Sequence, residues 1–183
     1  MHIISDEKMF GKLGKAETDI VQNFDSILQN INHLSSKQIF ALSQNINELS
    51  HELTDERGNR RNGYMNETIK LSAYAHYFMW WNIFRMTSLF ADLPQNAFSD
   101  LQDGDYCLDL GSGPLTLVIS LYLARPELRK LKLNWYCMDI SQKSMSLGEI
   151  RDYVDNVVNL SVDVNKSLEE ANGISVCKIR RAS

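Results

Sequence analysis

Residues 106–116 read YCLDLGSGPLT and are the most informative stretch of the sequence. Tyr106–Leu110 is a short apolar run typical of a strand, and Gly111–Pro114 is a glycine-rich turn. Leu115–Ala124 follows as an apolar helix, which ends shortly before a proline because proline disfavours helix in the residue that precedes it. A strand, a glycine turn and a helix in this order are typical of a site for nucleotide-type ligands.

The two glycines give this turn its chemical meaning. Gly111 and Gly113 allow a tight turn and let the backbone approach a ligand without a Cβ in the way. The helix N-terminus near Leu115–Thr116 adds free N–H groups and a partial positive charge.

Strands and helices alternate downstream of this stretch. Leu133–Met138 predicts a second strand, and Ser141–Val154 predicts a helix with Ser141 as its N-cap. Val157–Val164 alternates apolar and polar residues, which indicates a third strand. The polar tail Asn165–Ser183 has no clear pattern. The alternation predicts β-α-β units and a parallel sheet.

The residues upstream of the sheet are predicted to be helical. Ala16–His33 carries apolar residues at helical spacing, and Ser35–Ser36 offers an N-cap for the next amphipathic helix. That helix either packs within the chain or binds a partner. Met65–Leu93 is apolar nearly all round, so a long buried helix or a kinked pair is expected there. We therefore divide the chain into a helical region, 1–98, and a sheet region, 99–183.

A charged, glycine-containing loop, Thr54–Gly63, separates two of these helices. Arg57, Arg60 and Arg61 lie together in it. Such a loop is either a solvated connection or an arm that contacts phosphates, because the arginine fork matches phosphate oxygens.

Composition excludes several classes of protein. The 183 residues are 44% hydrophobic and 23% charged, which predicts a globular core and not general disorder. No apolar run is long enough for a membrane span, the polar N-terminus does not resemble a signal peptide, and a net charge of −4 excludes a globally basic nucleic-acid binder. Three cysteines predict reduced thiols and a cytoplasmic protein, and the four histidines lack metal-ligand spacing.

Three acidic residues indicate which ligand the turn would take. Asp109 precedes the first glycine, where a carboxylate suits an amino or sulfonium group and would repel pyrophosphate. Asp139 ends the second strand, where a carboxylate can accept both hydroxyls of a ribose. The third predicted strand carries Asp163, which could face the exocyclic amine of an adenine. Thr116 stands where a dinucleotide fingerprint has its third glycine, so a nicotinamide-dinucleotide domain is disfavoured.

These residues resemble the class I S-adenosylmethionine-dependent methyltransferases. Asp109–Gly113 matches the first motif of that family, D/E-x-G-x-G, while Asp139 and, more loosely, Asp163 match its later acids. The resemblance implies an α/β fold, in which the helical region precedes the first half of a doubly wound, mainly parallel Rossmann-like sheet. It also implies S-adenosylmethionine as the cofactor. The implied cofactor residues are Asp109, Gly111, Ser112, Gly113, Pro114, Asp139 and Asp163.

The helical region carries a second resemblance. The arginine loop, Gly63–Met65, Ala73–Tyr74, Tyr77 and Trp81–Asn82, followed by the glycine motif, is similar to methyltransferase-like proteins linked to small ribosomal subunit assembly. This similarity implies ribosomal RNA as a partner, contacted through Arg57, Arg60 and Arg61. The alternative to an enzyme is a non-catalytic, methyltransferase-like module for RNA binding or ribosome assembly.

Length limits what the resemblance can cover. The family's sheet has about seven strands, whereas 19 residues follow Val164, and each β-α unit needs roughly 30 residues. We therefore expect a C-terminally truncated chain that is inactive by itself, because the half that binds the substrate is missing. Tyr106–Leu110 would then be an exposed apolar sheet edge unless Met65–Leu93, a partner chain or self-association covers it.

Overall fold

The fold is taken from a computed structural model of the chain. The structure describes residues 12–31, 33–54, 64–145, 162–163, 169–171 and 174–181. Within these residues, no helix is long and apolar enough to cross a membrane.

Three helices open the described chain. The predicted helix over 16–33 is interrupted at Asn23, which separates α2 (Lys15–Gln22) from α3 (Phe24–Ile31). The next helix, α4 (Ser36–Thr54), begins as predicted, because the Ser35 hydroxyl accepts the Gln38 N–H while the Gln38 side chain accepts the Ser35 N–H.

A long composite helix follows, over the range that the sequence predicted. It consists of a 3₁₀ turn, η1 (Tyr64–Asn66), the helix α5 (Thr68–Ala73), a π-helical segment, η2 (Tyr74–Met79), and α6 (Trp80–Asp92). Ala75, Met79 and Ile83 are fully buried along it. The expected kink is therefore a wider π turn rather than a break.

The predicted β-α-β unit is confirmed. Strand β1 (Tyr106–Leu110) leads to α7 (Thr116–Ala124), a 3₁₀ turn η3 (Pro126–Lys130) and strand β2 (Asn134–Asp139). The two strands are parallel, with Asp109 opposite Cys137. A short helix, α8 (Gln142–Met145), begins after β2, and the Ser141 hydroxyl accepts the Ser144 N–H as its cap.

The rest of the sheet differs from the prediction. The described strands β3 (Val162–Asp163), β4 (Glu169–Ala171) and β5 (Ile174–Arg181) give the order β1-β2-β5-β3, with β4 also beside β5. The pairs that β5 forms with β2, β3 and β4 are antiparallel. The expectation of a mainly parallel sheet therefore holds for β1 and β2 alone among the described strands. Most of the predicted third strand and of the preceding helix lies outside the described residues.

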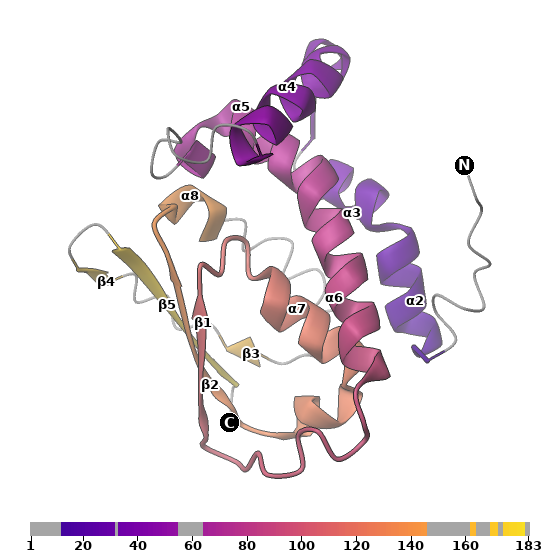
Figure 1. Ribbon diagram of the computed structural model, residues 1–183, viewed down its shortest axis with the longest axis vertical. Coiled ribbons are helices and arrows are strands. Elements are labelled where there is room, and N and C mark those ends of the chain that lie inside the picture. The colour runs from indigo at the N-terminus through magenta and orange to yellow at the C-terminus, as the bar shows by residue number, and fades with distance from the viewer. Residues whose placement is uncertain are drawn as a thin grey trace.

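Helices cover one face of the sheet. In Figure 1 the sheet, α7, α6 and the α2–α3 pair follow one another across the molecule. Helix α7 lies between the strands and α6, and eight of its nine residues are buried. This position explains why its sequence is apolar on all sides. On the uncovered side, Tyr106, Leu108 and Leu110 are exposed, and β1 lies at one end of the strand order. The composite helix lies on the α7 side, so it does not cover these three side chains, and no described strand pairs with the outer edge of β1.

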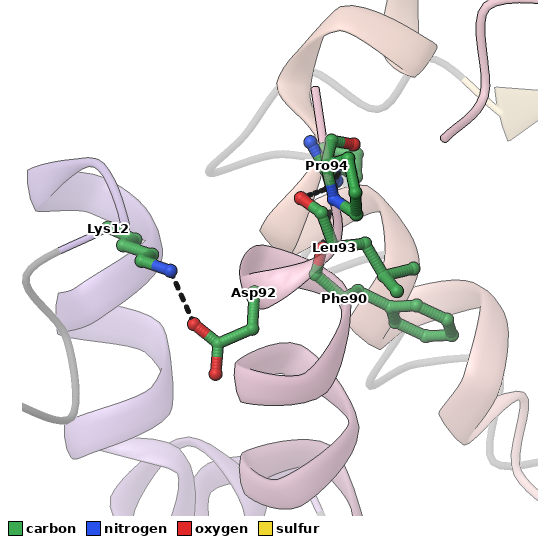
Figure 2. Close-up of polar contacts among 6 residues, drawn as sticks. Lys12, Phe90, Asp92, Leu93 and Pro94 are labelled. Atoms are coloured by element: carbon green, nitrogen blue, oxygen red, sulfur yellow. Dashed lines mark hydrogen bonds and ion pairs between the residues drawn. The ribbon is translucent and has the colours of Figure 1, made fainter. Parts of the chain in front are cut away.

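A buried arginine joins the helical region to the sheet region. The Arg125 side chain, which follows α7, donates hydrogen bonds to the carbonyls of Phe90, Leu93 and Pro94 at the end of α6. It also lies over the Phe98 ring, 5.5 Å from the centroid. Figure 2 shows the three residues whose carbonyls accept, beside the ion pair between Lys12 and Asp92.

We predict that Arg125→Met lowers the free energy of unfolding by about 2–4 kcal/mol, because three carbonyls lose a charged donor. Urea denaturation followed by circular dichroism measures this loss. Arg85→Met is the matched control, since Arg85 is exposed on α6 and its guanidinium lies over the Trp81 ring, and it should change stability by less than about 1 kcal/mol. Equal losses in the two variants would contradict the role given to Arg125.

Candidate functional site

The turn after β1 has a left-handed backbone at alternate residues. The φ angles of Gly111, Gly113 and Leu115 are +73°, +51° and +63°. The two glycines adopt this conformation without a steric penalty, whereas for leucine it costs about 1–2 kcal/mol. Burial of the Leu115 side chain in the core holds that residue in place. The turn is therefore a fixed structure at the start of α7.

The amides of the turn are bonded mostly within the protein. The N–H groups of Gly111 and Ser112 donate to the Met138 carbonyl on β2, at 2.8 and 3.1 Å, and the Leu115 N–H donates to the Ser112 carbonyl. The sequence predicted free N–H groups for a ligand near Leu115–Thr116. The Leu115 N–H is bonded within the protein, whereas the first amides of α7, beginning at Thr116, have no acceptor carbonyl within the helix.

Asp139 is held by two backbone amides. Its Oδ2 accepts the Gly113 N–H at 2.9 Å, and its Oδ1 accepts the Ser141 N–H at 2.7 Å. The carboxylate therefore joins the loop after β1 to the loop after β2. Each oxygen keeps one further acceptor position, so the predicted role in binding a ribose would be added to a structural one.

Asp109 lies close by in a different environment. Its side chain points to the helix-covered face, its residue is 6% exposed, and its Oδ2 has no hydrogen-bond partner among the described residues. Burial, and secondly the charge of Asp139, raise the pKa of the Asp109 carboxyl above its ordinary value. Ser112, at 5% exposed, likewise has a hydroxyl without a partner in the described chain. The buried Thr116 hydroxyl also has none, so three buried polar groups at the turn have no hydrogen-bond partner among the described residues.

The helical region closes one side of the turn. A Cβ built on Gly113 would lie 3.7 Å from the terminal methyl of Met65, in η1, whereas a Cβ on Gly111 would meet nothing within 4 Å. Gly113 and Pro114 are buried and Gly111 is exposed. The turn is therefore covered at Gly113 and open at Gly111.

Asn66, also in η1, links the segment that covers Gly113 to the residues after β2. Its side-chain oxygen accepts the Ser141 hydroxyl at 3.0 Å and the Lys143 N–H at 3.2 Å. Because the Ser141 N–H donates to Asp139, hydrogen bonds run from Asn66 through Ser141 and Asp139 to Gly113. The sequence did not single out Asn66, since an exposed asparagine after a loop carries no pattern of its own.

The π-helical segment begins with a half-buried tyrosine, Tyr74. The Tyr74 hydroxyl accepts a hydrogen bond from the Asn82 amide at 3.3 Å. Its pKa is raised, chiefly by burial, and the charge of Asp139 adds to this, while Asn82 and the Thr116 hydroxyl act in the opposite direction. Tyr74 and Asn82 belong to the resemblance with ribosome-assembly proteins noted above, which implied no role for either residue.

The remaining predicted site residues are not part of this cluster as described. Asp163 lies in β3 opposite Arg180 of β5, and its side chain is outside the described part. Arg57, Arg60 and Arg61 lie outside the described residues altogether. The structure thus brings together Asp109, Gly111, Ser112, Gly113, Pro114 and Asp139.

No protein-family model, no curated protein and no solved structure matches the chain.

We predict that Asp139→Asn lowers the free energy of unfolding by about 1–3 kcal/mol even without a ligand, because an amide nitrogen would replace one of two oxygens that accept backbone N–H groups. Thermal and urea denaturation measure the loss. Asp100→Asn, in an exposed turn, is the control and should leave stability nearly unchanged. A fully stable Asp139→Asn protein would show that the carboxylate does not join the two loops.

Proposed function

We propose that this chain binds S-adenosylmethionine at the Gly111–Thr116 turn and acts as a class I methyltransferase. The observation that carries the proposal is the buried Asp109 carboxylate, whose Oδ2 has no partner among the described residues. An uncompensated buried carboxylate is unfavourable, and a cationic donor would relieve it. The amino group of S-adenosylmethionine is such a donor.

The surroundings of Asp109 support the same ligand. Gly111 leaves open space where a side chain would stand, so a ligand can reach the backbone there. The Ser112 hydroxyl can donate or accept. The negative charges of Asp109 and Asp139 would repel a pyrophosphate, which favours S-adenosylmethionine over a dinucleotide as the ligand.

Each residue would have a distinct task in the bound state. S-adenosylmethionine supplies the reactive methyl group on its sulfonium. Asp109 would hold the amino group, and the first amides of α7 would favour the ligand's carboxylate. Met65 and the hydrogen bonds of Asn66 would keep water from the Gly113 side. These residues orient the ligand, which is the protein's contribution in this chemistry.

The substrate is a separate proposal. Ribosomal RNA, and the alternative of a non-catalytic module for ribosome assembly, depend on the resemblance of the helical region and on Arg57, Arg60 and Arg61. Both stay predictions, because these arginines lie outside the described residues.

A pair of glycine substitutions tests the binding site. Gly111 and Gly104 both have positive φ, +73° and +90°, and a Cβ on either meets nothing within 4 Å. Alanine should therefore strain the backbone at both positions to a similar degree. We predict that Gly111→Ala weakens S-adenosylmethionine binding about tenfold or more, because its Cβ stands where the ligand approaches, whereas Gly104→Ala binds like the wild type.

Isothermal titration calorimetry gives both affinities, and thermal denaturation confirms that the two variants are folded. A wild-type chain that gives no binding heat at millimolar S-adenosylmethionine would refute the proposal. Equal affinities of Gly111→Ala and Gly104→Ala would refute the placement of the ligand at this turn.

A second test uses the charge of Asp109. Since the folded-state pKa is raised, the unfolded chain loses this proton first as pH rises, so the carboxyl lowers stability above its ordinary pKa of about 3.9. We predict that Asp109→Asn is more stable than the wild type at neutral pH and that this gain disappears at lower pH, below that value. Urea denaturation across this pH range measures the difference.

Binding should change in the opposite direction. The wild-type affinity for S-adenosylmethionine should rise with pH through the raised pKa of Asp109, because the ionised carboxylate alone pairs with an ammonium. Asp109→Asn should bind more weakly and without this pH dependence. Asp92→Asn, on the surface, is the control and should follow the wild type. An Asp109→Asn variant that keeps the wild-type affinity would contradict the role of Asp109.

A further inference from the structure

The exposed side of the composite helix carries large side chains at every fourth position. Between residues 71 and 90 the exposed residues are Tyr77, Trp81, Arg85 and Leu89. The first lies in η2 and the other three lie in α6. A helix side that faces water normally carries charged and small polar residues, whereas three of these four are apolar or aromatic. We call the four residues the exposed ridge.

Other elements cover the remaining sides of this helix. Helix α6 packs against α7, and the Trp80 indole N–H donates to the Val21 carbonyl of α2 at 3.0 Å, so α6 lies between α7 and the α2–α3 pair (Figure 1). The exposed ridge runs along a side that neither covers, since Tyr77 is 44% exposed and Leu89 is 60% exposed. Aligned apolar side chains on an exposed face are typical of interaction surfaces, where tyrosine, tryptophan and arginine are enriched.

The order of residues makes the exposed ridge complementary to itself. Two copies can pair antiparallel about a two-fold axis at the level of Ile83, so that each contact occurs twice. Trp81 of one copy then lies opposite Arg85 of the other, and Tyr77 lies opposite Leu89. A parallel pair in register would instead place the two arginines against each other. The sequence of the ridge therefore favours a second copy of this chain in the antiparallel orientation.

Arg85 supplies the charge complementarity for this pairing. Its guanidinium lies 5.6 Å from the centroid of the Trp81 ring in its own chain. A cation over an aromatic ring is held more strongly once water is excluded, so the same guanidinium gains when it lies over the Trp81 ring of a second copy. Residues four apart also form the row of side chains that fits the grooves of another helix in the commonest class of helix packing.

We propose that the exposed ridge is the interface of a homodimer in which two copies of α6 pack antiparallel. One helix from each copy forms most of the contact, so the interface is small and the dimer is weak, with a Kd on the order of 10 μM. This association does not depend on ligand binding at the glycine turn.

Sedimentation equilibrium of the full chain over a range of protein concentrations tests the dimer. We predict that the wild type associates and that Leu89→Glu raises the Kd about tenfold or more, because two carboxylates would enter an apolar contact. Ile39→Glu is the matched control, since Ile39 is 50% exposed on α4, and its Kd should equal that of the wild type. Circular dichroism shows that the variants are folded.

A pair of opposite charges tests the antiparallel register. Tyr77→Glu and Leu89→Lys should each weaken the dimer, whereas the chain with both substitutions should associate about fivefold more tightly than either single variant. The carboxylate introduced at position 77 would then lie opposite the ammonium introduced at position 89 of the second copy. The two positions are twelve residues apart in the chain, too far to pair within one helix.

Three results would overturn the proposal. The first is a wild-type chain that stays monomeric up to about 0.5 mM. The second is a dimer that Leu89→Glu and Ile39→Glu weaken equally, because the interface would then lie elsewhere. The third is a double variant that associates no more tightly than the single variants, because position 77 would then not lie opposite position 89. Rescue by the double variant supports the interface even where one single variant has lost stability.

Discussion

The Asp139 carboxylate joins the parts of the protein that would have to act together. One oxygen holds Gly113 in the loop after β1, and the other holds Ser141 in the loop after β2. Asn66, from the helical region, binds Ser141 in turn. The two bonds to Asp139 are formed between buried groups, so they are stronger than the same bonds in water. They hold the glycine turn in one shape beside Asp109.

Asp109 and Asp139 show how two carboxylates can differ within one small site. Two backbone amides satisfy Asp139, whereas Asp109 has a raised pKa and an oxygen without a partner among the described residues. Ionising such a buried carboxyl without a partner is unfavourable, which is the cause of the raised pKa. Strained or uncompensated groups are typical of binding sites, where a ligand supplies what the fold lacks. The contrast therefore supports Asp109 as the ligand-facing acid and Asp139 as the residue that organises its surroundings.

The central β-α-β unit could be predicted from sequence because its signals are local. An apolar run, two glycines and a proline-terminated apolar segment determine β1, the turn and α7 with few alternatives, and Ser35 and Ser141 mark helix starts through their own hydrogen bonds. The antiparallel position of β5 could not be predicted, since Ile174–Arg181 is a mixed polar run and its partner β2 is distant along the chain. Pairing of that kind depends on tertiary contacts rather than on propensity.

Only the local part of the site could be predicted from sequence. The positions of Asp109, Gly111, Gly113 and Asp139 follow from their places beside the ends of predicted strands. Two other features depend on packing between distant segments: one oxygen of Asp109 has no partner among the described residues, and Asn66 binds Ser141.

Binding of S-adenosylmethionine at the glycine turn can be located by mapping backbone amide chemical shifts during a titration. We predict saturable changes concentrated at residues 109–118 and 139–141, with little change at the exposed start of α4. An absence of saturable changes at the Gly111–Thr116 turn, or changes confined to another part of the chain, would contradict it.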